Sequence, residues 1–227
     1  MFKIKEKINI LISLPKTIYF NFKVLPFNKA IKLPFFIQND VELGNLYKGC
    51  IFINDEIEKF MVKIGIRWKH DGVPELGKTR MDFAKNSKLI FRKNVEIACG
   101  TTIKIGKNAT IAFGEDFFCN KNCNIVSEER IEFGDEVLIG WNVSIRDNDG
   151  GNHCIIKNGI VKENKKKITV GNHVWICACV SLLKGIEIPD NCVVAYNSCV
   201  NKQFVKENTL IAGYPAKVIE ERIEWKR

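Results

Sequence analysis

Hydrophobic residues recur at every sixth position in the C-terminal part of the chain. Between residues 170 and 200 aliphatic residues stand six apart, and a small or branched residue follows four positions after each of the first five. This period matches neither an α-helix nor an ordinary alternating strand. It is typical of short strands that close three-sided coils and stack, so it predicts a parallel β-helix. The leading positions are Val170, Ile176, Leu182, Ile188, Val194 and Val200.

The same unit occurs earlier with Phe133, Ile139 and Ile145 as leading residues, and weaker copies begin at Phe91 and Ile97. We therefore expect the β-helix to occupy residues 91–227. Residues 1–90 show no clear six-residue register and are expected to form an N-terminal extension. Their Phe-rich, Pro-containing start predicts extended or short helical segments that pack on one end of the coil stack.

Two segments depart from the repeat. Residues 146–168 are rich in Asp, Asn and Gly at their start, which predicts an excursion loop that leaves the stack between two coils. Near the C-terminus, Val218, Ile219, Ile223 and Trp225 suggest the apolar face of a short helix over Ala216–Lys226. The expected fold class is all-β.

The motifs IGWNVSIRD, GNHVWI and IAGYPAKVI resemble the hexapeptide-repeat acyltransferases, over roughly residues 90–220. The chain is most similar to the sugar O-acetyltransferases related to maltose and galactoside acetyltransferases, a branch often found in polysaccharide biosynthesis. The resemblance implies a left-handed β-helix, acetyl-CoA as co-substrate, and a homotrimer with its active site between subunits. One departure is Cys177, where the family usually has glycine.

Charge and composition constrain the partners. The 227 residues fit one domain with an extension, and Ile8–Leu14 is too short for a membrane span and lacks the small-residue cleavage site of a secretory signal. The net charge of +9 favours an anionic partner. Without a basic amphipathic helix to read DNA, nucleic acid is not expected. The basic N-terminal segment would allow weak peripheral contact with an anionic membrane.

The nine cysteines are odd in number and match no zinc-ribbon or CxxC spacing. Reduced thiols that fill small apolar spaces, in a cytoplasmic protein, are the expected state. The histidines, at positions 70, 153 and 173, lack the spacing of a three-histidine metal site, so no metal is expected.

His153 lies in the excursion loop, where the family carries its general base. An alcohol attacks a thioester slowly, and imidazole can accept the hydroxyl proton at neutral pH. The alternatives are that His153 is only solvated, or that His173 or His70 is the base. Cys154 follows His153 directly, but adjacent side chains in an extended chain point apart, so we expect direct transfer without an acyl-cysteine.

The resemblance also implies residues around the acceptor and the co-substrate. Asn142 matches an acceptor-pocket position, and Trp141 beside it would stack on a sugar or serve packing. Asp147 and Asp149 would bind the acceptor or orient the imidazole, although both also suit a turn. Glu220 stands where relatives can have a phosphate-binding arginine. The co-substrate positions are Trp175, Ala178, Tyr196, Asn201, Lys202 and Lys217.

The function predicted from the sequence is an acetyl-CoA-dependent O-acetyltransferase that acts on a sugar hydroxyl. Transfer to the nitrogen of an amino sugar or nucleotide-amino-sugar stays open, because the same fold and base would serve it. A non-catalytic β-helix scaffold is the further alternative.

Overall fold

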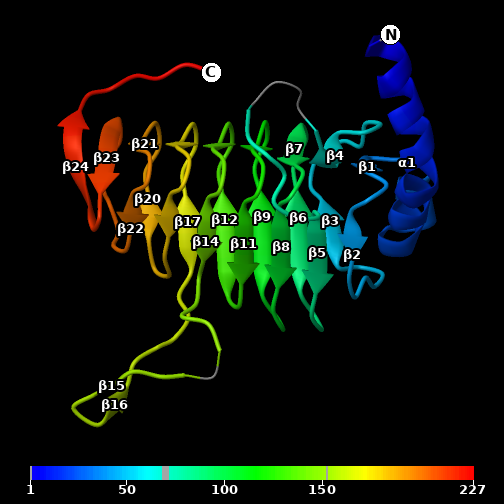
Figure 1. Ribbon diagram of the computed structural model, residues 1–227. Helices are drawn as coiled ribbons and strands as arrows, with labels where there is room; N and C mark the ends of the chain where they lie inside the picture. Colours follow the sequence, from blue (N-terminus) through cyan, green and yellow to red (C-terminus); the bar gives the residue numbers. More distant parts are fainter. Residues whose placement is uncertain (1, 68–71, 152) are drawn as a thin grey trace.

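The computed structural model describes residues 2–67, 72–151 and 153–227. The chain passes repeatedly through three sheets, here called A, B and C, in that order, and the strands in each sheet are parallel except for β24 in sheet A. Figure 1 shows the coils side by side in one long row. Sheet A contains β1 (Phe35–Ile37), β4 (Val62–Ile66), β7 (Val95–Ala98), β10 (Phe118–Cys119), β13 (Leu138–Ile139), β18 (Trp175–Ile176), β21 (Val193–Val194), β23 (Thr209–Gly213) and β24 (Ala216–Glu221).

The other two sheets complete the three-sided stack. Sheet B contains β2 (Glu42–Leu43), β5 (Arg80–Phe83), β8 (Thr102–Ile105), β11 (Asn124–Ser127), β14 (Ser144–Arg146), β19 (Ser181–Leu182) and β22 (Cys199–Val200). Sheet C contains β3 (Ile51–Ile53), β6 (Lys88–Phe91), β9 (Thr110–Phe113), β12 (Arg130–Phe133), β17 (Ile168–Val170) and β20 (Glu187–Ile188).

The six-residue period has a direct structural cause. Val170 pairs with Ile188, and Ile176 pairs with Val194, so corresponding residues of the last coils are 188 − 170 = 18 positions apart. Eighteen residues are three units of six, one for each sheet. All six leading aliphatic residues are at most 2% exposed. The expected all-β parallel β-helix is confirmed.

Aromatic rings fill the N-terminal half of the core. Phe35 meets Phe91 at 5.3 Å between ring centroids, Phe91 meets Phe113 at 5.4 Å, and Phe113 stacks on Phe133 at 5.4 Å with an interplanar angle of 3°. Phe20 of the N-terminal helix continues this column beyond the first coil, at 5.3 Å from Phe35. The helix and the coils therefore share one core.

The coil stack begins earlier than the sequence pattern indicated. Strands β1 to β5, and β6 up to residue 90, lie within the expected extension, yet they join the three sheets in register with the later coils. Insertions between these strands, such as residues 67–79 between β4 and β5, hide the period. In the structure the stack therefore begins at Phe35 rather than at residue 91, and the two helices precede it.

The N-terminal segment forms one long helix, α1 (Phe2–Val24), and the short α2 (Phe27–Ala30), rather than extended or short helical pieces. Figure 1 shows α1 across the end of the stack, beyond β1. Thr17 Oγ1 accepts from the Ile37 N–H and donates to the Ile37 carbonyl, at 3.0 and 3.1 Å. Asn21 bonds the N–H and carbonyl of Phe35 in the same way. These side chains replace the missing strand beside β1 and close an exposed edge.

The expected C-terminal helix is wrong. β24 (Ala216–Glu221) folds back antiparallel on β23, where Ile211 pairs with Val218. In this hairpin the backbone N–H and carbonyl groups of β24 form their hydrogen bonds with β23. Four apolar residues in a sequence pattern cannot reveal such pairing with another strand. Residues 222–227 then run back along sheet A, where the Arg227 guanidinium lies 5.0 Å from the Phe118 ring. Neither α1 nor α2 is long and apolar enough to span a bilayer.

The excursion loop is present where expected, between the end of β14 at Arg146 and the start of β17 at Ile168. It carries a two-stranded hairpin, β15 (Ile156–Lys157) and β16 (Ile160–Val161). Figure 1 shows this hairpin well clear of the stack.

Candidate functional site

The coils turn at corners that stack into long edges. The edge where the chain passes from sheet A to sheet B is here called the A/B edge. The edge where it passes from sheet B to sheet C, from which the excursion loop departs, is called the B/C edge. The candidate residues are distributed over these two edges and sheet A.

Trp141, Ala178 and Tyr196 lie on consecutive turns of the A/B edge. The Cys179 N–H donates to the Trp141 carbonyl at 2.8 Å, and the Asn197 N–H donates to the Ala178 carbonyl at 3.0 Å. These bonds hold successive turns in register. Residues that are 37 and 18 positions apart in sequence (178 − 141 and 196 − 178) thus form one continuous line on the surface.

Asn142 lies on the same edge, and its backbone conformation explains why an asparagine occupies this position. Its φ of 58° is left-handed, a conformation that asparagine adopts more easily than most residues. Two residues before it, Gly140 packs so closely on the next turn that a Cβ there would lie 2.5 Å from the Ala178 nitrogen. The Asn142 side chain is exposed, so it remains accessible to a ligand.

Two polar groups on the A/B edge are notable. The Trp141 indole nitrogen is buried and has no hydrogen-bond partner among the described residues. A buried donor without an acceptor costs about 1–3 kcal/mol. Tyr196 is 68% exposed, and the Cys179 thiol beside its hydroxyl raises the pKa of Tyr196. The edge therefore combines a buried N–H that has no acceptor among the described residues with an accessible protonated phenol.

Lys217 lies close to this edge through the C-terminal hairpin. It pairs with Ala212, next to the turn that joins β23 and β24. The Gly213 N–H at that turn donates to Ser198 Oγ at 3.1 Å, and Ser198 belongs to the A/B edge. The hairpin thus brings one cation near the end of the line formed by Trp141 and Tyr196.

Asp147 does not face an acceptor, contrary to the expectation. It is fully buried, and its carboxylate accepts from Ser127 Oγ at 2.6 Å and from the N–H groups of Glu128 and Glu129 at 2.7 and 2.9 Å. Asn148 adds a further donor at 3.1 Å. A carboxylate whose oxygens are occupied in this way fixes the exit of the excursion loop and leaves nothing for a ligand.

The neck of the loop is clasped by its two arms. The Asp149 N–H donates to the Asn164 carbonyl at 2.8 Å, and the Lys166 N–H donates to the Asp147 carbonyl at 2.8 Å. The Asp149 carboxylate is half-exposed and forms an ion pair with Lys184. Sequence reasoning missed Lys184, although its place two residues after a leading aliphatic residue puts it on the same edge as the loop.

His153 lies on the excursion loop beyond this neck, and its side chain is exposed. Asn201 and Lys202 follow β22 on the same B/C edge, one coil past Leu183, whose N–H donates to the Val200 carbonyl at 3.0 Å. The loop that carries the expected base therefore leaves the stack from the same edge that holds two of the expected co-substrate residues. That edge is separated from Trp141, Ala178 and Tyr196 by the width of sheet B.

His173 has a structural role in the chain. Its ring nitrogens lie 3.0 Å from a Glu136 carboxylate oxygen and 3.1 Å from the Trp225 carbonyl oxygen, and its ring stacks on the Trp225 indole at 4.1 Å. The ring of Trp175, the first residue of β18, lies 6.0 Å from the same indole. Trp225 thus covers part of sheet A, which the sequence did not suggest. His70 lies outside the described residues.

Six of the nine cysteines are buried and all nine are free, so their expected role as small apolar fillers is confirmed for most of them. Cys154, beside His153, is exposed.

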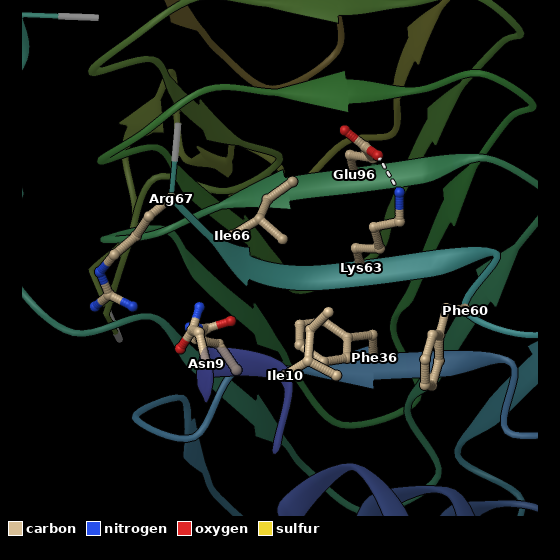
Figure 2. A pocket seen from close by; sticks show the side chains of 9 residues that line it. Asn9, Ile10, Phe36, Phe60, Lys63, Ile66, Arg67 and Glu96 are labelled. Atoms are coloured by element: carbon tan, nitrogen blue, oxygen red, sulfur yellow. Dashed lines mark hydrogen bonds and ion pairs between the residues drawn. The ribbon is translucent and has the colours of Figure 1, made fainter. Parts of the chain in front are cut away.

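A separate cavity of about 310 Å³ lies at the N-terminal end, between α1 and the outer side of sheet A. Figure 2 shows Phe36 and Phe60 along one side and the ion pair of Lys63 with Glu96, at 2.8 Å, along the other. Arg67 at its rim is likewise paired with carboxylates. The described lining contains none of the predicted site residues, and its cations are already neutralised.

Comparison with known proteins gives likenesses to sugar acetyltransferases. The chain is 35% identical over 128 residues to galactoside O-acetyltransferase of Escherichia coli K12, covering 56% of this chain and 58% of that protein. It is 30% identical over 226 residues to an uncharacterized 24.8 kDa protein in the cps region of Klebsiella pneumoniae, covering 99% and 85%. No family model matches the chain.

Among solved structures, the polySia-specific acetyltransferase NeuO superposes with a TM-score of 0.51 at 20% identity, over 86% of this chain and 89% of that one. This likeness shows the fold, the left-handed parallel β-helix. The chain spans less than two thirds of the length of the E. coli relative.

Proposed function

The chain belongs to the hexapeptide-repeat acyltransferase family, and from this membership we propose that it is an acetyl-CoA-dependent O-acetyltransferase acting on a sugar hydroxyl. The likeness to galactoside O-acetyltransferase supports both the reaction and a saccharide acceptor. The near full-length likeness to a protein of a cps region fits a role in modifying a surface polysaccharide or a saccharide precursor.

One observation carries the proposal: the candidate residues lie on two edges that border the same sheet. Trp141, Ala178 and Tyr196 follow the A/B edge, whereas Lys202 lies on the B/C edge and His153 on the loop that leaves from it. In a trimer whose threefold axis runs parallel to the stack and faces sheet B, the A/B edge of one subunit meets the B/C edge of the next. Each interface then unites the two halves of the site.

The outer surface of sheet B suits such an arrangement. Thr102, Asn124, Ser144 and Ser181 lie at corresponding positions of successive coils, and all are small or short polar residues. Short side chains allow close approach of three subunits around an axis.

The A/B edge fits an elongated ligand with an anionic end. The exposed Tyr196 offers a flat ring and a hydroxyl, and Lys217 lies near the end of the line. From the opposite subunit, Lys202 would add a second cation. When bound, acetyl-CoA supplies the thioester whose acetyl group is transferred.

His153 would act as the general base. Its neutral imidazole accepts the proton of the acceptor hydroxyl as the oxygen attacks the carbonyl carbon. A new ester C–O bond forms and the C–S bond breaks, and the imidazolium returns the proton to the departing thiolate. Asp147 contributes indirectly, because it fixes the point where the loop leaves the stack.

Acetyl-CoA-dependent thiol release in the presence of neutral sugars tests the chemistry. His153→Ala should lower turnover about 10²–10⁴-fold, the usual worth of a positioned base, while the melting temperature stays unchanged. The neighbouring Cys154→Ala is the control and should retain activity. Normal turnover of His153→Ala refutes the mechanism. A preference for amino sugars would indicate N-transfer, and no effect of acetyl-CoA on the melting temperature would favour a scaffold.

Mixed trimers test the shared site. Ala178→Trp would block the A/B edge, so it should be inactive alone, as should His153→Ala. Co-expression in equal amounts should restore about a quarter of the wild-type activity, because an active site then needs one intact edge from each of two neighbours. Absence of recovery in assembled mixed trimers would contradict a site between subunits.

A further inference from the structure

Helix α1 is attached to the stack mainly through polar and aromatic residues on one side. Ser13, Thr17, Phe20 and Asn21 are buried, and Thr17 and Asn21 bind the backbone of β1. This side is fully used by the fold.

The opposite side is apolar and exposed. The exposed apolar positions 8, 11, 12, 18, 19 and 22 fall on one face of a helix with 3.6 residues per turn. Leu11 is 69% exposed, and Phe27, just beyond the helix, is 71% exposed. Nine of the 22 exposed large hydrophobic residues among the described side chains fall within residues 8–31, a concentration that marks an interaction surface rather than scattered exposure. The stripe and its continuation, called the α1 outer face, consist of Ile8, Leu11, Ile12, Ile18, Tyr19, Phe22, Phe27 and Ile31.

The same segment carries most of the net charge. Residues 1–34 contain seven lysines and one acidic residue, Glu6, which gives 7 − 1 = +6 of the total +9. Lys23 and Lys32 are exposed beside the outer face. An apolar stripe flanked by lysines is the composition that binds the surface of an anionic bilayer.

We infer that the α1 outer face docks on an anionic phospholipid membrane, with the helix lying in the plane of the interface. A second copy of the chain is a poorer occupant, because two such faces would bring +6 against +6. The helix lies across the end of the stack, so its outer face points away from the coils (Figure 1). The membrane can therefore approach without meeting the excursion loop.

The proposed trimer would strengthen membrane binding by the α1 outer face. If the threefold axis runs parallel to the stack, the three helices of a trimer share one end of the particle and face the same way. Three weak contacts with one surface then act together and strengthen binding. The inference for a single chain does not depend on the trimer.

Co-sedimentation of the full-length protein with vesicles tests the inference. The protein should pellet with phosphatidylcholine vesicles that contain phosphatidylglycerol and stay in the supernatant with phosphatidylcholine alone, and added salt should release it. Leu11→Glu should weaken binding about tenfold, because it removes an inserted side chain and adds a repelled charge. Val205→Glu is the matched control: Val205 is 93% exposed at the other end of the stack, so its binding should equal the wild type.

Other outcomes overturn the inference. A wild-type protein that never pellets, or a Leu11→Glu variant that pellets as well as Val205→Glu, removes the membrane from consideration. If Leu11→Glu instead lowers the particle mass in light scattering, the face packs against a second copy. Thiol release with a water-soluble sugar is measured in parallel and should be equal in all three proteins, so failure of the proposed enzyme activity is distinguishable from failure of membrane binding.

Discussion

Replacement of Asp147 by asparagine probes the anchor of the excursion loop. The variant keeps the shape of the side chain but turns one oxygen into an NH₂ group. Whichever orientation it adopts, that group faces the N–H of Glu128 or of Glu129, which lie 2.7 and 2.9 Å from the carboxylate oxygens. A backbone donor then loses its acceptor in a fully buried place.

The expected cost follows from these contacts. An unsatisfied buried donor costs about 1–3 kcal/mol, and hydrogen bonds to a charged group contribute about 1.5–3 kcal/mol. We expect a loss near 3 kcal/mol in the free energy of unfolding. For a chain of this size, each kcal/mol lowers the melting temperature by about 2–4 °C, so the shift should reach roughly 6–12 °C.

Asp149→Asn is the matched control. Its carboxylate pairs with Lys184 at the surface, and an exposed ion pair is worth at most about 1 kcal/mol. Both variants are compared by thermal unfolding and by thiol release. Asp147→Asn should also lower kcat, because the loop that carries His153 loses its fixed exit. Equal melting temperatures for the two variants would refute the assignment of Asp147 as the anchor.

Two further predictions concern the core and the thiols. Phe113→Ala should lower the free energy of unfolding, measured in urea, by about 3–5 kcal/mol. Phe52→Ala is the control and should cost much less, because Phe52 is 41% exposed on sheet C. Similar losses for the two variants would mean that the aromatic column adds no stability. Burial raises the pKa of Cys99 to about 11. At neutral pH an alkylating reagent should therefore modify the exposed Cys154 and spare Cys99 in peptide mapping, and Cys99 should be labelled only as the pH nears 11. Equal labelling of the two cysteines in the native protein at neutral pH would contradict this.

The sequence predicts the coils well where nothing interrupts them. Between residues 170 and 200 each corner has the same length, so buried residues recur at a constant interval and the period is visible. Between Phe35 and residue 90 the strands have the same inward side chains, such as Val62 and Ile64, but the corners vary in length and destroy the interval. The coils continue through this region because strand pairing depends only on the strands themselves. The six-residue period in the sequence also requires corners of constant length, so it is lost there.

The candidate site is less accessible to sequence reasoning. The pattern places Trp141 and Ala178 on corners, and the structure sets them on one edge. Burial of Asp147 could not be anticipated, since an Asp-Asn-Asp-Gly run equally suits an exposed turn. Trp225 was expected on a helix, but it stacks on His173, because the strand pairing of β24 directs the following residues back over sheet A.

The C-terminal tail has a consequence for how the molecule opens. In a stack of coils each coil contacts only the coils directly beside it. The last coil would therefore ordinarily unfold locally while the rest of the stack stays folded. Here Trp225 binds His173 and Arg227 reaches Phe118, which lies several strands inward from β24 in sheet A. Peeling off the final hairpin therefore requires breaking contacts in the middle of the row. The tail joins the end of the stack to its centre, so hydrogen exchange should be nearly as slow at β23 as at β13.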